Sequence, residues 1–205
     1  MTHYFANDPN LSSVEKQVKV EINEQLFSFT TDNGVFSKKG LDFGTRSLLA
    51  SIPLEDLSGK ILDFGCGYGP IGIYISKITG IKVDMLDVNK RSVALTKKNA
   101  LINKVDVNVF ESNIYSNVVE KYNYIITNPP IRVGKKILYE ILFDAKKHLL
   151  KGGQLWLVIN KNQGAKTLAR DLEKEYDVKI IDKNKGFYII CAINNWQFVY
   201  MLLKL

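Results

Sequence analysis

An amide side chain and two prolines follow an apolar run in the sequence YIITNPP, residues 124–130. Proline has no backbone N–H and a fixed φ, so Pro129 and Pro130 cannot continue a strand ladder. They can instead hold the chain rigidly where Asn128 leaves the strand. The carbonyl of the Asn128 side chain and the backbone carbonyl of Pro129 are two acceptors that can orient the two hydrogens of an amine. The alternative is a proline corner that only ends the strand.

A second group of residues has the composition of a nucleotide-binding turn. The sequence ILDFGCGYGPIG places Gly65, Gly67 and Gly69 at alternate positions after a short apolar run. Glycine allows backbone conformations and close approaches that a side chain blocks. The dinucleotide fingerprint is G-x-G-x-x-G, to which Gly72 gives a looser match. A nicotinamide-dependent oxidoreductase therefore stays an alternative, although the Asn-Pro-Pro corner and the lack of a Tyr-Lys or His proton donor argue against it.

Two carboxylates end the neighbouring apolar runs. Asp87 ends VDMLD, about 20 residues beyond the glycine loop, where an acid can accept both hydroxyls of a ribose. Asp63 ends the preceding run and can hold the loop or a ligand ammonium group. A competing role for Asp87 is the N-cap of the helix that follows, for which Asn89 is also suited.

These residues need a framework that brings the ends of several strands together. From Lys60 onward, short apolar runs alternate with segments whose apolar residues recur at helical spacing. This alternation predicts right-handed crossovers and a doubly wound α/β fold, with a mainly parallel seven-stranded sheet that has one antiparallel strand. Ligands of such sheets bind at the carboxyl ends of the strands. Helices are expected over 44–52, 70–79, 90–103, 134–150 and 163–176, strands over 60–65, 81–88, 105–112, 122–128 and 152–160, and a closing hairpin over 176–193.

The segment before this framework has a different pattern. Residues 17–37 alternate in their first half and carry the turn signal Asp32-Asn33-Gly34, which predicts a short antiparallel hairpin. We therefore expect an N-terminal extension and hairpin over residues 1–33, and an α/β domain over residues 34–205.

The composition limits the class of protein and its partners. A chain of 205 residues with 46% hydrophobic and 24% charged residues predicts one folded domain. The net charge of +7 favours a polyanionic partner, although many lysine-rich proteins bind no RNA. There is no secretory signal and no apolar run near the roughly 20 residues of a membrane span. Cys66 and Cys191 form no metal-ligand pattern. These features predict a cytoplasmic protein, a monomer or homodimer, with no membrane association and no metal.

The glycine loop followed by Asp87 resembles the cofactor-binding motif of class I S-adenosylmethionine-dependent methyltransferases. The resemblance implies that the loop passes under the methionine part of the cofactor and that Asp87 binds its ribose. An Asn-Pro-Pro sequence followed by an aromatic residue is similar to the motif of amino-methyltransferases that act on adenine, guanine or glutamine. Here Ile131 stands at the fourth position, and it can pack on a ring face but lacks π-stacking.

Three further stretches resemble RsmC-type small-subunit ribosomal RNA guanine amino-methyltransferases in a single-domain form: GVFSKKGLDFGTRSLL, ESNIYSNV and NPPIRVGKK. The resemblance implies S-adenosyl-L-methionine as cofactor, ribosomal RNA as partner and methyl transfer to the exocyclic amine of guanine. A protein glutamine or an adenine in nucleic acid is an alternative acceptor, and a non-catalytic RNA-binding module is an alternative class. Arg132, Lys135 and Lys136 can contact phosphates, or can simply be solvated residues that begin a helix.

The motifs and the resemblance together assign two sets of residues. The catalytic set is Asn128, Pro129, Pro130 and Ile131. The cofactor-binding set is Phe36, Ser37, Gly44, Thr45, Asp63, Gly65, Cys66, Gly67, Gly69, Asp87, Val88, Ser112, Asn113 and Asn128. Structural alternatives are a hairpin exit near Ser37, a helix N-cap at Thr45 and a simple turn at Ser112-Asn113. The sequence NKGFYII also resembles the family pattern, and the packing of a core strand is the competing reason for it.

Overall fold

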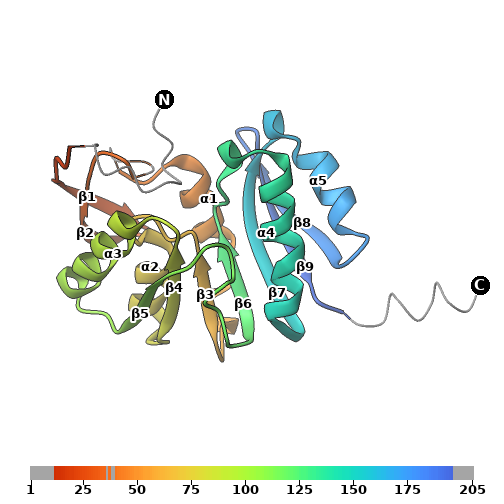
Figure 1. Cartoon of the computed structure of the whole chain (residues 1–205), viewed down its shortest axis with the longest axis horizontal. Helices are drawn as coiled ribbons and strands as arrows, with labels where there is room; N and C mark the ends of the chain where they lie inside the picture. Colours follow the sequence, from red (N-terminus) through yellow and green to blue (C-terminus); the bar gives the residue numbers. More distant parts are fainter. Residues whose placement is uncertain (1–11, 36, 38–39, 196–205) are drawn as a thin grey trace, which may run out of the picture.

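A seven-stranded sheet organises the structure, a computed structural model that describes residues 12–35, 37 and 40–195. The strand order is β5-β4-β3-β6-β7-β9-β8. Only β9 runs opposite to the other six strands of this sheet, and this confirms the predicted doubly wound architecture (Figure 1). The strands of the sheet are β3 (Ile61–Phe64), β4 (Val83–Asp87), β5 (Val107–Glu111), β6 (Tyr122–Thr127), β7 (Leu149–Asn160), β8 (Asp177–Asn184) and β9 (Phe187–Ile193).

Local signals in the sequence begin and end several helices. Asp42 caps the first helix, Pro70 stands in the first turn of the second, and Gly80 ends it in a left-handed conformation. Asn89 caps the third helix. The helices are α1 (Phe43–Ser51), α2 (Pro70–Thr79), α3 (Lys90–Asn103), α4 (Lys135–His148) and α5 (Ala165–Leu172), with short 3₁₀ turns η1 (Leu54–Asp56), η2 (Ile131–Val133) and η3 (Lys161–Gln163).

The helices cover both faces of the sheet. Side chains of α1, α2 and α3 belong to one buried cluster, and side chains of α4 and α5 belong to another. The strand β7 separates the two clusters by alternation, because Trp156 and Val158 belong to the first and Leu155 and Leu157 to the second. In Figure 1, α2 and α3 lie beside β3, β4 and β5, and α4 and α5 lie beside β7, β8 and β9.

The expected N-terminal hairpin is present as β1 (Lys16–Ile22) and β2 (Gln25–Thr31), which pair antiparallel. Its turn is Asn23–Glu24, with φ of 44° and 65°, and not the signal at Asp32-Asn33-Gly34. Asn tolerates the left-handed backbone that a two-residue hairpin loop requires. The hairpin lies beside α3 (Figure 1), and its Phe27 and Phe29 share the buried cluster of that helix. The division at residues 33 and 34 stays a prediction.

Two predicted helices differ most from the structure. The helix predicted over 134–150 ends at His148, because Leu149 pairs with Tyr122 and begins a strand that was expected only from Gly152. The helix predicted over 163–176 is shorter, since Gly164 adopts a φ of 85° between η3 and α5. Both differences arise from strand pairing and loop geometry that helical spacing does not encode.

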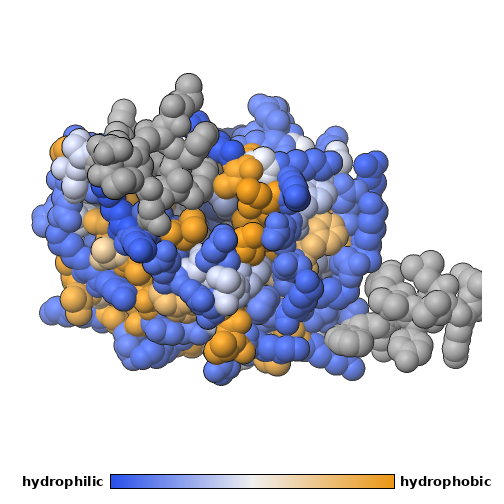
Figure 2. Space-filling model, in the orientation of Figure 1, coloured by the Kyte–Doolittle hydropathy of each residue, from blue (hydrophilic) through white to orange (hydrophobic). Residues whose placement is uncertain are grey.

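The described part of the chain has no helix that is long and apolar enough to cross a bilayer. Figure 2 shows a mostly hydrophilic face, with some apolar residues gathered near its middle. Large apolar side chains such as Leu101 and Val119 are exposed, at 80% and 93%. Singly exposed apolar side chains are ordinary on protein surfaces and need no partner.

Candidate active site

A cavity of about 580 Å³ lies at the carboxyl ends of the central strands. The chain leaves β3 for β4 on one side, whereas β6 pairs with the other side of β3, so the strand order reverses here. Ligands of open α/β sheets bind at this switch point, and the volume is within the usual range for a small-molecule site. The predicted residues that line the cavity are Ser37, Thr45, Gly65, Cys66, Gly67, Asp87, Val88, Ser112, Asn113, Asn128, Pro129, Pro130 and Ile131.

Three of the predicted residues that the structure describes do not line this cavity. Gly44 and Asp63 are buried next to lining residues, and Gly69 is the N-cap of α2. Phe36 lies outside the described residues. The cofactor-binding role of Gly44, Asp63 and Gly69 stays a prediction, and in the structure these residues lie next to residues of the cavity wall.

The glycine loop after β3 leaves open space along the cavity wall. Gly65 and Gly67 adopt φ of 72° and 60°, which L-residues with side chains rarely adopt. A Cβ atom on either residue would meet no atom within 4 Å, apart from its chain neighbours. The loop therefore presents bare backbone to the cavity, as a closely bound ligand requires.

Asp87 at the end of β4 is tied to this loop. Its Oδ2 accepts a hydrogen bond from the Gly67 N–H at 2.9 Å, and its Oδ1 accepts one from the Asn89 N–H at 2.8 Å. Burial raises the pKa of Asp87 to about 6, against the lowering effect of the backbone N–H groups. The N-cap of α3 is Asn89, whose side chain accepts from the Arg91 N–H, so the capping role considered for Asp87 is wrong.

Asp63 is a buried carboxyl with one open oxygen. Its Oδ2 accepts from the Gly72 N–H of α2 at 2.9 Å, which holds the helix against β3. Its Oδ1 has no hydrogen-bond partner among the described residues, and the residue is 0% exposed. Burial and the nearby charge of Asp87 raise the pKa of Asp63 to about 7. The open oxygen can accept one more hydrogen bond.

The Asn-Pro-Pro corner after β6 reaches the cavity beside α1. The Asn128 Nδ2 atom lies 2.9 Å from the Thr45 Oγ1 atom and 3.4 Å from the Asp42 Oδ1 atom. The Pro130 carbonyl accepts from the Val133 N–H and begins η2, which contains Ile131. The strand end, α1 and η2 thus meet at one wall of the cavity.

Ser112 and Asn113 line the cavity in a turn after β5. The Ser112 hydroxyl donates to the Ile114 carbonyl at 2.9 Å and accepts from the Asn117 N–H at 3.2 Å. The Ser112 side chain therefore stabilises the turn, which is the structural role considered for it in the sequence. The residue nevertheless lines the cavity.

Sequence reasoning missed several lining residues. Asp42, Phe43, Tyr68, Asn160, Gln163 and Phe187 all line the cavity. Phe187 belongs to the stretch NKGFYII, and its ring lies 5.7 Å from that of Phe43. A Cβ atom at Gly44 would lie 3.0 Å from the Phe187 Cε1 atom and 3.1 Å from the Asp42 Oδ1 atom, so a side chain there would force these neighbours to shift by a few tenths of an ångström. Contacts between residues so distant in sequence leave no local signal, although the quoted stretches GVFSKKGLDFGTRSLL, ILDFGCGYGPIG and NKGFYII contain several of these residues.

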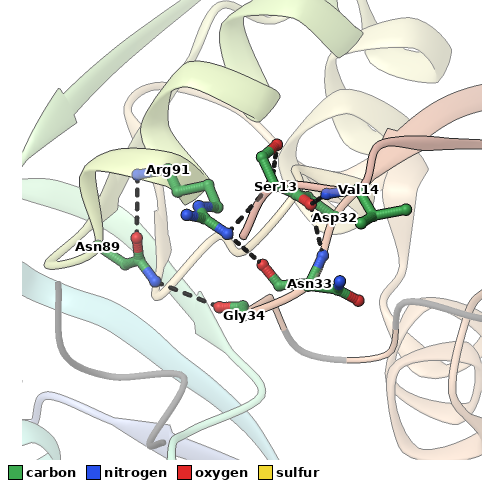
Figure 3. A network of polar contacts seen from close by, with 7 residues as sticks. All are labelled: Ser13, Val14, Asp32, Asn33, Gly34, Asn89 and Arg91. Atoms are coloured by element: carbon green, nitrogen blue, oxygen red, sulfur yellow. Dashed lines mark hydrogen bonds and ion pairs between the residues drawn. The ribbon is translucent and has the colours of Figure 1, made fainter. Parts of the chain in front are cut away.

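A polar network connects the segment after β2 to the start of α3 (Figure 3). Asp32 accepts hydrogen bonds from Ser13 and Val14, and its Oδ2 lies 3.3 Å from the Arg91 Nη1 atom. Arg91 also donates to the Asn33 carbonyl at 2.7 Å. Asn89 donates to the Gly34 carbonyl at 3.3 Å, next to the segment that leads to Ser37. The network therefore holds Gly34, where that segment begins, close to Asp87.

A metal centre has no basis in the described part of the chain, where no three His, Cys, Asp or Glu side chains gather in a way that could hold an ion. The cavity also contains a polar group without a partner there. Tyr68 is 2% exposed, and its hydroxyl has no hydrogen-bond partner among the described residues. Such a group is available for a ligand.

A glycine loop after β3, an acid at the end of β4 and an Asn-Pro-Pro corner after β6 of a doubly wound sheet define a Rossmann-like methyltransferase. The model of the methyltransferase small domain family matches residues 26–191, and the chain belongs to that family.

Relatives and solved structures agree with this family. The Bacillus subtilis protein YbxB is 42% identical over 195 residues, which cover 93% of this chain and 97% of YbxB. The ribosomal RNA small subunit methyltransferase C of Psychromonas ingrahamii is 34% identical over 184 residues, 87% of this chain and 52% of the relative. The chain therefore spans about half the length of such relatives. The structure of the T. thermophilus 16S rRNA N2 G1207 methyltransferase (RsmC) in complex with AdoMet and guanosine has a TM-score of 0.81 at 23% identity, over 91% of this chain and 52% of that one.

Proposed function

We propose that this protein transfers a methyl group from S-adenosyl-L-methionine to the exocyclic amine of a guanine in ribosomal RNA. The observation that carries the proposal is the position of Asn128, which lines one cavity together with Gly65, Gly67 and Asp87. An amide carbonyl beside a nucleotide-type site is suited to an acceptor amine. The relatives named ribosomal RNA small subunit methyltransferase C support the choice of RNA, and the fold neighbour solved with AdoMet and guanosine supports the choice of guanine.

The residues of the cavity fit the cofactor. Bare backbone at Gly65 and Gly67 leaves room for a ligand against the loop, and the Asp87 carboxylate suits the hydroxyls of a ribose. The Tyr68 hydroxyl is a buried polar atom on the cavity wall that a ligand with amino and carboxylate groups can satisfy. Asp63 does not line the cavity, and its Oδ2 atom holds α2 through the Gly72 N–H. When bound, S-adenosylmethionine supplies a methyl group on a sulfonium, which is activated for transfer.

The chain's own contribution is to orient the acceptor nitrogen. An exocyclic amine is a poor nucleophile because its lone pair is delocalised into the ring. The Asn128 side-chain carbonyl and the Pro129 backbone carbonyl can accept its two hydrogens and stabilise positive charge that develops on it. Since the proton can leave after methyl transfer, no strong base is required first. The two prolines limit the reorganisation of these carbonyls.

RNA contacts would surround the mouth of the cavity. Arg132 lines the cavity, and Lys135 and Lys136 are exposed at the start of α4. Together with the net charge of +7, they suit phosphates near the target nucleotide. A base in folded RNA must be unpaired or flipped to reach Asn128. A cytoplasmic location, and a monomeric or dimeric state, are parts of the same proposal.

Labelled S-adenosylmethionine tests the proposal. The protein is incubated with small ribosomal subunits, free small-subunit RNA and total protein, and methylated nucleosides are then separated. We expect label in N2-methylguanosine, and we expect none with Asn128→Ala at a cofactor affinity within about threefold of the original, because the amide binds the acceptor. If label enters only protein or only adenine, the acceptor is that group and not guanine. Turnover that Asn128→Ala leaves unchanged would contradict the role of the corner.

A further inference from the structure

The amide of Asn128 makes its hydrogen bonds to α1, an element far away in sequence. Its Nδ2 atom lies 2.9 Å from the Thr45 Oγ1 atom, and Thr45 is only 3% exposed. The Thr45 hydroxyl in turn lies 2.6 Å from the Asp42 Oδ2 atom. The other carboxylate oxygen, Asp42 Oδ1, accepts from the Thr45 N–H at 3.0 Å and lies 3.4 Å from the Asn128 Nδ2 atom.

These contacts have a direction that follows from the chemistry of the groups. A carboxylate only accepts hydrogen bonds, so the Thr45 hydroxyl must donate its one proton to Asp42. The hydroxyl oxygen is then left as an acceptor, and its partner on Asn128 must be the NH₂ group. The assignment of nitrogen and oxygen in the Asn128 amide thus follows from the network.

A reversed amide would be unfavourable at this place. It would put the Asn128 carbonyl oxygen next to the Asp42 carboxylate and opposite a hydroxyl whose proton is already donated. Both contacts would then join acceptors. With the NH₂ group held against α1, the carbonyl oxygen of Asn128 is the group left for a ligand in the cavity that this residue lines.

We propose that Asp42 and Thr45 are positioning residues that set the direction of the Asn128 amide, so that its carbonyl oxygen faces the acceptor amine. This inference rests on the proposed function, since it concerns the same methyl transfer. It adds a role for Asp42 beyond capping α1, and a role for Thr45 that does not require contact with the cofactor. It also explains why the corner after β6 lies beside the start of α1.

Two nearly isosteric substitutions separate direction from packing. Asp42→Asn keeps a good N-cap, but its NH₂ group can donate to the Thr45 hydroxyl and allow the whole chain of hydrogen bonds to reverse. Thr45→Val keeps the shape and removes the hydroxyl. Thr45→Ser keeps the hydroxyl and serves as the conservative rescue. Ser76→Ala, which removes a buried hydroxyl of α2 that bonds to the Asp106 carbonyl, is the control for a lost hydroxyl elsewhere.

The readouts are kcat and KM for RNA, cofactor affinity by calorimetry, and the side-chain amide signals of Asn128 in a nitrogen-15 spectrum, which are assigned by their loss in Asn128→Ala. We expect Asp42→Asn and Thr45→Val to lower kcat by about 10- to 100-fold, since a preorganised polar group is misdirected. We expect cofactor affinity to stay within about threefold, because in this proposal Asp42 and Thr45 act on the Asn128 amide and not on the cofactor. Thr45→Ser should recover most of kcat, and Ser76→Ala should resemble the original protein.

The possible results distinguish a positioning role of Asp42 and Thr45 from a purely structural one. If kcat of Asp42→Asn and Thr45→Val stays within about threefold of the original while Asn128→Ala is inactive, the positioning role is refuted. An equal loss of kcat and cofactor affinity in both variants would also refute it, because that pattern belongs to a disturbed α1. If the original protein methylates no RNA, the proposed function fails. The direction of the amide is then judged by the spectrum alone, in which unchanged Asn128 signals in Thr45→Val would disprove it.

Discussion

Two glycines of this protein form a matched pair that tests where the cofactor binds. Gly65 lines the cavity and Gly80 ends α2, and both have a φ of 72°. Both donate a backbone hydrogen bond of 2.9 Å, to the carbonyls of Leu86 and Ser76 respectively. A Cβ atom on either would meet no atom within 4 Å. The two positions therefore differ mainly in their surroundings, because the open space at Gly65 belongs to the cavity and the open space at Gly80 does not.

The expected cost of alanine in stability is the same at both positions. A side chain in the left-handed region costs about 1–2 kcal/mol. For a chain of 205 residues this predicts a fall in Tm of about 2–8 °C for Gly65→Ala and for Gly80→Ala. Thermal unfolding without ligand, followed by calorimetry or circular dichroism, checks that the two variants are equally destabilised.

The expected cost in ligand binding is different. At Gly65 the new methyl group occupies the cavity wall, where a ligand must shift or strain to avoid it, at about 1–3 kcal/mol. This corresponds to a loss of about 5- to 150-fold in affinity for S-adenosylmethionine. Gly80→Ala should bind within about twofold of the original protein, since Gly80 does not line the cavity. Equal affinities of the two variants would refute the assignment of the glycine loop to the cofactor.

Three more perturbations test other parts of the site. Burial raises the pKa of Asp63 to about 7 and that of Asp87 to about 6, so both are partly protonated below pH 7, and binding of a cationic cofactor should release protons. Affinity should fall as pH decreases from 7.5 to 5.5, and calorimetry in two buffers that differ in ionisation enthalpy measures the release; a constant affinity would contradict this. Phe187→Leu should raise KM for RNA by about tenfold through lost stacking on a base, with cofactor affinity unchanged. If only cofactor affinity falls, the Phe187 ring contacts the cofactor and not the base. Asp32→Ala should lower the free energy of unfolding by about 1–3 kcal/mol at pH 7, because it removes the buried carboxylate that accepts hydrogen bonds from Ser13, Val14 and Asn33. Burial opposes ionisation of Asp32, but hydrogen bonds from Ser13, Val14 and Asn33 and the charge of Arg91 hold its pKa below the usual value; its contribution is therefore present above about pH 4 and lost as pH falls through the lowered pKa, as urea unfolding at pH 7 and pH 3 would show.

Local signals made much of the fold predictable. The bounds of α2 and α3 agree with the prediction because Pro70, Gly80 and Asn89 act within their own turn of the chain. The end of α4 was not predictable from spacing, since the pairing of Leu149 with Tyr122 decides it. The hairpin was predicted, while its turn at Asn23–Glu24 carries a weaker signal than Asp32-Asn33-Gly34.

The candidate site was predictable where one short motif forms one wall. The glycine loop, Asp87 and the Asn-Pro-Pro corner each follow a strand, and parallel strands place their carboxyl ends at one edge. Asp42 and Phe187 were missed as site residues because their roles depend on contacts across the sheet. Asp42 looks like a simple N-cap in sequence, and its contact with Asn128 appears only when the end of β6 meets the start of α1.

Ile131 stands where the resembling motif has an aromatic residue after Asn-Pro-Pro, and β9 supplies an aromatic residue, Phe187, to the same cavity. Ile131 and Phe187 both line the cavity, and Phe187 packs against Phe43 at the start of α1. Gly44 permits this packing, because a Cβ atom there would lie 3.0 Å from the Phe187 ring. We therefore expect the aromatic surface for the target base to come from β9, and not from the position after the motif. If so, the glycine of the GTRSLL stretch and the phenylalanine of NKGFYII belong to one base-binding surface, because one makes the space that the other fills.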